Sequence, residues 1–141
     1  MLEPIEIALT QKIAMIFEIA GKQQKNPYVF TMKFISSKTY NDLFTFLPGE
    51  IEQSPLCEYK MFVKEMEAKH IKIPDLDKRI EYDYMFWLGW LLTYWGYLKK
   101  VHPAEIIQKY DVVQMIGAYE TLHTMKTETA IDFIMNEYCM E

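Results

Sequence analysis

Residues 81–100, EYDYMFWLGWLLTYWGYLKK, contain all three tryptophans of the chain, together with four tyrosines and one phenylalanine. The uninterrupted apolar part, from Met85 to Leu98, covers roughly 14 residues, whereas a membrane-spanning helix needs about 20. Acidic residues precede this part, and Lys99 and Lys100 follow it. We therefore expect residues 81–100 to form the central helix of a helical domain, and we expect no membrane span.

On a helical wheel this segment has two apolar faces, whereas a surface helix keeps one face polar. The first face has the spacing of a core stripe and comprises Tyr84, Trp87, Leu88, Leu91, Trp95 and Leu98. The second comprises Phe86, Trp90, Thr93, Tyr94 and Tyr97. Gly89 and Gly96 are typical of sites where another helix backbone comes close. Either both faces are buried inside the monomer, or the second is a binding surface.

The remaining sequence also predicts helices. Prolines suited to the first helical turn and apolar residues at helical spacing place them at 4–21, 27–35, 37–47, 55–69, 103–109, 111–122 and 127–138. Gly21 is the expected C-cap of the first helix, Asp111 opens a capping box, and Thr127 is the expected N-cap of the last helix. His70 to Ile73 is the only strand candidate.

These patterns predict an all-α fold. We expect a compact single-domain bundle of about 7–8 helices around the central helix 81–100. The N-terminal helices occupy 4–69, a loop occupies 70–80, and the C-terminal helices occupy 103–139. A chain of 141 residues, half of them apolar, is long enough for one good core.

Composition predicts a cytoplasmic protein. The first residues lack the positive flank and small-residue cleavage site of a signal peptide. Cys57 and Cys139 lie far apart and form no metal-binding spacing, so reduced thiols are the simplest interpretation.

The net charge of −5 is concentrated near the C-terminus. Residues 111–141 contain a single base, Lys126, and six acids: Asp111, Glu120, Glu128, Asp132, Glu137 and Glu141. Such a region repels phosphate backbones, so we expect no direct nucleic-acid partner. It suits a basic protein surface, although a solvated face that keeps the domain soluble has the same composition.

Two Glu-x-x-His pairs, Glu67–His70 and Glu120–His123, are the only candidates for a metal site. Such pairs build di-iron centres in four-helix bundles. Here both histidines fall near predicted helix C-termini, where an imidazolium is favoured by the helix dipole, and the helices are short. The cysteines have no suitably spaced histidine, and no Gly-x-Ser-x-Gly motif occurs. We therefore expect no enzymatic activity and no cofactor.

Two stretches of the chain carry a family resemblance. An F-x-x-S-x-T-Y-x-x-L segment is followed by a Tyr- and Trp-rich helix, a short acidic-capped helix, and L-H-T-M before A-I-D. The matching residues are Phe34, Ser37, Thr39, Tyr40, Leu43, Leu122, His123, Thr124, Met125, Ala130, Ile131 and Asp132. Residues 34–65 and 94–134, about half of the chain, thus resemble small uncharacterised bacterial proteins found mainly in Firmicutes and related gut bacteria.

Members of that group are often encoded beside proteins similar to ADP-ribosyltransferase toxins. The resemblance therefore implies an antitoxin or accessory protein, which binds and neutralises a protein partner and is not an enzyme. The chain departs from the group at Lys99-Lys100 and at His102-Pro103, where a Gly/Ser-rich turn is more common.

These observations together predict a non-enzymatic interaction protein of antitoxin or inhibitor type, whose partner is a toxin or defence protein with a basic surface. The expected partner-binding residues are Phe86, Trp90, Tyr94, Tyr97, Glu120 and Asp132. Three alternatives stay open at this point. They are a phage-encoded inhibitor of a host defence protein, a structural subunit that forms a homodimer through the same face, and a helical metalloenzyme that uses the Glu-x-x-His pairs.

Overall fold

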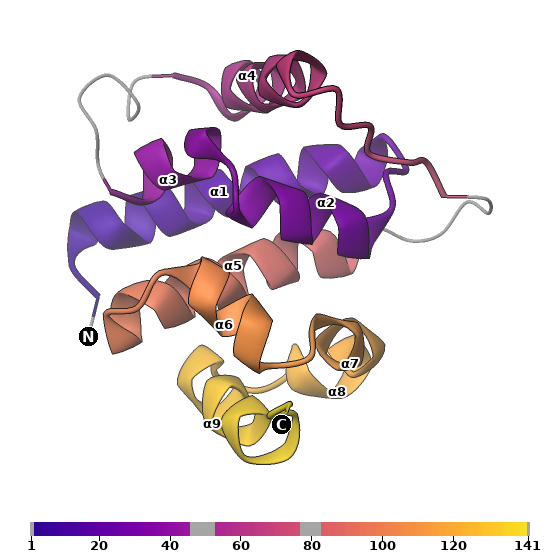
Figure 1. Ribbon diagram of the computed structural model, residues 1–141. Helices are drawn as coiled ribbons and strands as arrows, with labels where there is room; N and C mark the ends of the chain where they lie inside the picture. The colour runs from indigo at the N-terminus through magenta and orange to yellow at the C-terminus, as the bar shows by residue number, and fades with distance from the viewer. Residues whose placement is uncertain (1, 46–52, 77–82, 141) are drawn as a thin grey trace.

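A computed structural model describes residues 2–45, 53–76 and 83–140. Within these ranges the chain forms nine α-helices and no strand (Figure 1). They are α1 (Pro4–Lys22), α2 (Pro27–Ile35), α3 (Lys38–Phe44), α4 (Pro55–Ala68), α5 (Asp83–Lys99), α6 (Pro103–Lys109), α7 (Val112–Gly117), α8 (Tyr119–Leu122) and α9 (Thr127–Glu137). The predicted all-α fold is confirmed.

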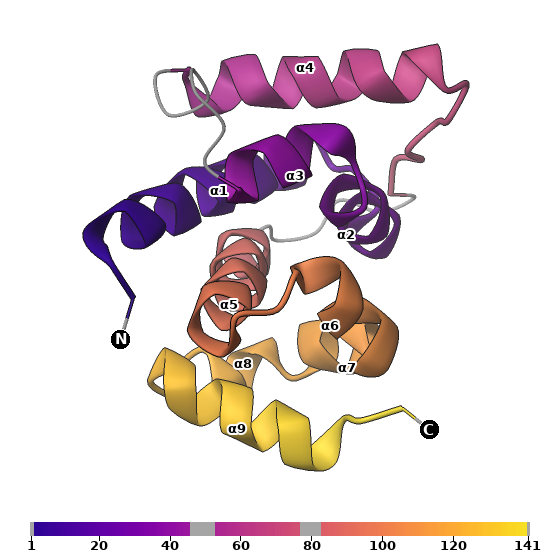
Figure 2. The same cartoon turned by 60° about the vertical axis from the view of Figure 1, so that its left-hand side comes forward.

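The aromatic helix α5 is central, as its sequence predicts. It packs along α1 on one side and against α6, α7 and α9 on the other. Helix α4 packs on α1 and α3, away from α5. Figures 1 and 2 both show α4 and α9 at opposite ends of the molecule, with α1 and α5 between them.

Aromatic rings from α1, α2 and α4 form the core on the α1 side. The Phe17 ring meets Phe30 edge to face at 5.2 Å between ring centroids, and it meets Phe34 at 5.6 Å. Phe34 in turn meets Phe62 of α4 at 5.1 Å. All four side chains are buried, so three helices are joined by one cluster with favourable edge-to-face geometry.

The two glycines of α5 allow close packing, but the neighbouring groups differ from those expected. A Cβ built on Gly89 would lie 2.6 Å from Cδ1 of Phe17, which is a side chain rather than a helix backbone. A Cβ on Gly96 would lie 2.8 Å from Cγ of Pro103 and 2.9 Å from the Val101 carbonyl oxygen. Glycine is therefore needed at Gly89 because α5 packs directly on the Phe17 ring.

Several helix ends differ from the prediction. Helix α1 does not end at Gly21, which is buried within its last turn, but continues to Lys22. The three longest described helices, α1, α5 and α4, are instead followed by a non-glycine residue in the left-handed region. These residues are Gln24 (φ 57°), Lys100 (φ 56°) and His70 (φ 57°).

The C-terminal helices also differ from the prediction. The expected helix 111–122 is interrupted at Ala118 and forms α7 and α8, although Asp111 does cap α7 through bonds from the Val113 and Gln114 amides. Thr127 is not the N-cap of α9; that position belongs to Lys126. The Thr127 hydroxyl instead accepts a hydrogen bond from the Trp90 indole N–H of α5.

Other expectations fall partly outside the described residues. The predicted helix 37–47 is observed as α3, which ends earlier than predicted, at Phe44 with Thr45 as its C-cap; residues 46 and 47 lie outside. Residues 70–76 form neither helix nor strand, so the strand candidate His70–Ile73 is not observed as a strand. Residues 77–80 of the predicted loop lie outside the described ranges, and so do residues 81 and 82 of the predicted helix 81–100. None of the helices in the described ranges combines the length and apolarity needed to cross a bilayer.

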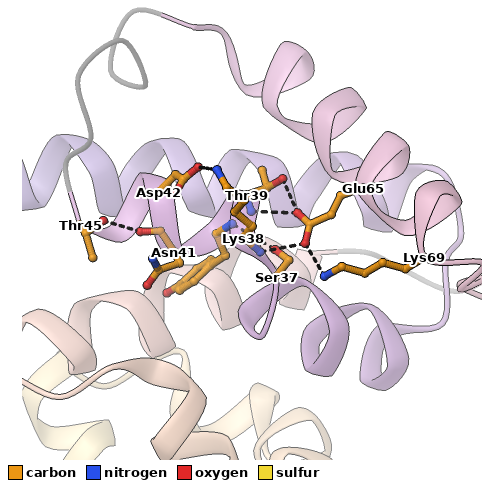
Figure 3. A network of polar contacts seen from close by, with 9 residues as sticks. Ser37, Lys38, Thr39, Asn41, Asp42, Thr45, Glu65 and Lys69 are labelled. Carbon is orange, nitrogen blue, oxygen red and sulfur yellow. Dashed lines mark hydrogen bonds and ion pairs between the residues drawn. The ribbon is translucent and has the colours of Figure 1, made fainter.

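A carboxylate on α4 holds the start of α3. Glu65 accepts hydrogen bonds from the backbone amides of Lys38 (2.8 Å) and Thr39 (2.9 Å), from the Thr39 hydroxyl (2.8 Å), and from Lys69 Nζ (2.8 Å) (Figure 3). Burial acts to raise the pKa of Glu65, but these four bonds outweigh it and lower the pKa to about 2. We call this arrangement the Glu65 clasp.

Candidate functional site

The predicted second face of α5 is only partly open. Thr93 is fully buried, and its hydroxyl lies 2.9 Å from the hydroxyl of Tyr40. Tyr97 is 8% exposed; its ring stacks on Phe44 at 4.3 Å, and its hydroxyl donates to the Phe44 carbonyl at 2.9 Å. Both residues belong to the core beneath α3, so the prediction of Tyr97 as a partner anchor is corrected.

The open part of the face lies nearer the start of α5. Phe86, Trp90 and Tyr94 are all half-buried there, and so is Trp87, which the sequence had placed in the core stripe. Phe86, Trp87 and Trp90, together with residues of α8, of α9 and of the turn between them, border a shallow groove of about 410 Å³. It is lined by Phe86, Trp87, Trp90, Tyr119, His123, Met125 and Thr127, and we call it the aromatic groove.

Contacts between α5 and α9 fix one wall of the aromatic groove. The Trp90 indole Nε1–H donates to Thr127 Oγ1 at 3.2 Å, and the Trp90 and Tyr94 rings stack at 6.0 Å. The Tyr94 hydroxyl donates to Glu128 at 3.0 Å. Burial, and then the bond and charge of Glu128, raise the pKa of Tyr94, which therefore stays a neutral donor. This wall is held in place without a ligand.

The other wall is built by α8. The Tyr119 ring meets Trp87 at 5.4 Å and stacks on His123 at 4.3 Å with an interplanar angle of 19°. His123 Nδ1–H donates to the Tyr119 carbonyl at 2.7 Å. That bond places the proton on Nδ1, because a carbonyl can only accept. The aromatic rings of this wall are thus held in place by contacts with neighbouring rings and by the hydrogen bond to the Tyr119 carbonyl.

The helices that border the aromatic groove carry exposed carboxylates. Glu120 follows Tyr119 on α8, Glu128 follows Thr127 on α9, and Asp132 lies one turn further along α9; all three are exposed. Lys126 is the only base in this part of the sequence. Aromatic faces attract cations through their quadrupole, and nearby carboxylates add to that attraction. The groove is therefore suited to an arginine or lysine side chain.

The structure keeps the two Glu-x-x-His pairs apart. Glu67 and His70 are exposed at the end of α4, whereas Glu120 lies on α8 and His123 directly follows that helix, on the opposite side of α1 and α5 (Figure 2). Among the described residues, no three His, Cys, Asp or Glu side chains are grouped so that they could hold a metal ion. The two pairs cannot share a centre in this arrangement.

Five residues of the aromatic groove are absent from the predicted partner-binding set: Trp87, Tyr119, His123, Met125 and Thr127. Trp87 has core spacing, and nothing in the sequence shows that α8 stops short of covering it. His123 and Met125, by contrast, belong to the segment that carries the family resemblance. In the first of the two stretches, Phe34, Tyr40 and Leu43 are buried and therefore have roles in packing. Ser37 caps α3, and Thr39 binds Glu65.

Comparison with protein families, with curated proteins and with solved structures found no match to the chain.

Proposed function

We propose that this chain is a non-enzymatic interaction protein of antitoxin or inhibitor type that binds a basic surface of a partner protein in the aromatic groove. One observation carries the proposal: a groove of about 410 Å³ lined by aromatic rings lies beside exposed carboxylates of α8 and α9. Aromatic residues with a polar edge are common at the centres of protein interfaces, and charge complementarity raises the association rate.

The roles of the groove residues differ. The faces of Trp87 and Tyr119 provide the stacking surface for a cationic side chain, while Phe86 and Met125 add apolar contact area. Glu120 and Asp132 steer the partner through long-range attraction. Trp90 and Tyr94 act indirectly, because their hydrogen bonds hold α9 beside the groove. Replacing Trp90 and Tyr94 together would therefore loosen α9 as well as remove contact area.

A charge-reversal experiment tests the proposal. Tagged wild-type protein and the double variant Glu120→Lys/Asp132→Lys are used to capture binding proteins from the source cells, and the captured partner is then purified for calorimetric titration. Both positions are exposed, so the variant should fold as the wild type does. We expect at least a tenfold loss of affinity, and a wild-type affinity that falls as salt concentration rises.

The matched control is Glu67→Lys/Glu105→Lys, which changes the net charge equally at two exposed positions outside the aromatic groove. It should bind as the wild type does. A second variant, Trp87→Ala, should lose binding while its circular dichroism stays helical. Equal binding by the wild type and the groove variants, or an equal loss in the control, would contradict the proposal. A stable dimer whose affinity depends on Glu120 and Asp132 would instead identify the partner as a second copy.

A further inference from the structure

A second hollow lies at the other end of the molecule, between α2, α4 and residues 71–76. Its volume is about 170 Å³. The lining is almost entirely apolar and includes Phe30, Tyr59, Phe62, Met66, Ile71 and Ile73. The hollow is partly open to solvent, because Val63, Glu67 and Lys72 in its lining are exposed. We call this hollow the apolar cavity.

Residues 71–76, here called the strap, form one side of the apolar cavity through Ile71 and Ile73 and are fixed at both ends. The Ile71 amide donates to the Met66 carbonyl at 2.9 Å, at the end of α4. At the other end, the Asn26 amide donates to the Pro74 carbonyl at 2.8 Å, at the start of α2. Figure 1 shows the strap leaving α4 toward the connection between α1 and α2. The cavity is therefore formed before any ligand binds.

The opening of the apolar cavity carries balanced charges. Lys25 Nζ lies 2.7 Å from Asp75 Oδ1, so this cation is already paired. Lys72 and Glu67 are exposed and contribute one charge of each sign. A charged ligand would gain no net attraction at this opening, and it would lose its hydration in an apolar lining. The charges and the lining together favour an uncharged ligand.

We propose that the apolar cavity binds a small neutral apolar molecule of about the size of one aromatic ring. The volume supports this size, because an engineered cavity of about 150 Å³ lined by Leu, Ile and Phe binds benzene. Phe30, Tyr59 and Phe62 are among the lining residues, and aromatic rings pack favourably with one another, so an aromatic guest suits this lining. This site is separate from the aromatic groove, so it does not depend on the proposed function.

Nuclear magnetic resonance with toluene tests the site. The protein is labelled at its methionine and isoleucine methyl groups, and toluene, benzoate and benzylammonium are titrated separately. We expect saturable shifts at Met66, Ile71 and Ile73 with toluene, at millimolar concentration or below. Binding of the two charged analogues should be at least tenfold weaker. Absence of saturable shifts at these three methyls, or equal binding of the charged analogues, would overturn the proposal.

Two filled variants and one control locate the site. Val63 borders the apolar cavity and is 39% exposed, so Val63→Phe can place a ring into it from α4. Ile73→Trp fills it from the strap. The control Val113→Phe makes the same exchange as the first variant, at a position 59% exposed on α7. Both filled variants should lose toluene binding at least tenfold, and the control should keep it. Unchanged binding in both filled variants would refute the site.

Discussion

The two sides of α5 are covered in different ways. On the α1 side, Gly89 allows the Phe17 ring to pack on the helix, and the rings of Phe30, Phe34 and Phe62 enclose it without exposure to solvent. On the α9 side, Phe86, Trp87, Trp90 and Tyr94 are of similar size but stay half-buried. On that side α8 is short, and α9 is joined to Trp90 and to Tyr94 by one hydrogen bond each, so the rings are covered less completely than on the α1 side. The same kind of residue thus makes a core on one side and a groove on the other.

The same substitution on the two sides should show the largest difference. Phe17→Ala removes a fully buried ring and should lower the free energy of unfolding by about 4 kcal/mol. Phe86→Ala removes a half-buried ring from the aromatic groove and should cost only about 1 kcal/mol, because less apolar area returns to water. Urea unfolding followed by circular dichroism measures both. Equal losses would show that the groove side is as well packed as the core.

Two glycine substitutions sharpen the comparison. Alanine at Gly89 must displace the Phe17 ring, which is held by Phe30 and Phe34, so Gly89→Ala should cost about 2 kcal/mol despite the better helix propensity of alanine. At Gly117 a Cβ meets nothing within 4 Å, so Gly117→Ala should be neutral or stabilise by up to about 1 kcal/mol. Thermal unfolding of the two variants provides the measurement. A tolerated Gly89→Ala would mean that Phe17 can shift.

The Glu65 clasp stabilises only the α1 side, and it predicts a dependence on pH. The pKa of Glu65 is lowered from 4.5 to about 2, so the carboxylate stabilises the fold fully above about pH 4.5. That contribution is lost as the pH falls toward 2, because protonation removes the acceptor. Glu65→Gln should cost about 1.5 kcal/mol at neutral pH and should show a flatter loss of stability than the wild type between pH 4.5 and 2.

The control for the clasp is Glu67→Gln, two residues along α4, where the side chain is exposed. At neutral pH its unfolding free energy should be close to that of the wild type, because an exposed side chain contributes little to stability. Parallel curves for Glu65→Gln and the wild type in the acid range would contradict the assigned pKa. Urea titrations in steps of about half a pH unit would resolve the difference.

The smallest effect is expected on the α9 side. Tyr94→Phe removes the hydroxyl that donates to Glu128 at 3.0 Å but keeps the ring stacked on Trp90. An exposed hydrogen bond of this kind contributes little, so the loss should be about 0.5 kcal/mol. Hydrogen exchange of the α9 amides is the sensitive measurement, and it should speed up before global stability changes. Unchanged exchange in α9 would show that Trp90 alone holds this wall.

The sequence predicts the fold of this chain better than its site. The helices are set by local signals, which can be recognised in the sequence alone. These signals are the apolar spacing, the prolines and the caps Asn26, Ser54 and Asp111. The helix break at Ala118 and the hydrogen bond from Trp90 to Thr127 are tertiary. No local pattern encodes them, and they decide where α8 and α9 lie on α5.

The exposure of individual side chains on α5 was predicted less well for the same reason. On a helical wheel Trp87 belongs with the core and Tyr97 with the open face. In the structure α3 covers Tyr97, whereas α8 leaves Trp87 half-buried. Tyr97 is covered because Phe44 stacks on it, and Trp87 stays half-buried because Tyr119 meets it only edge-on. The periodicity of one helix shows that two faces are apolar, but the ends of its neighbours decide which residues stay accessible.

The ends of the three longest helices carry one more consequence. Gln24, His70 and Lys100 occupy a backbone region that glycine adopts at much lower cost. Glycine at any of these three positions should therefore raise the free energy of unfolding, and none of them lines the aromatic groove. A sequence selected only for robustness would have glycine or asparagine at such positions. Engineers who need a hardier form of this protein can start at these three helix ends and leave the groove untouched.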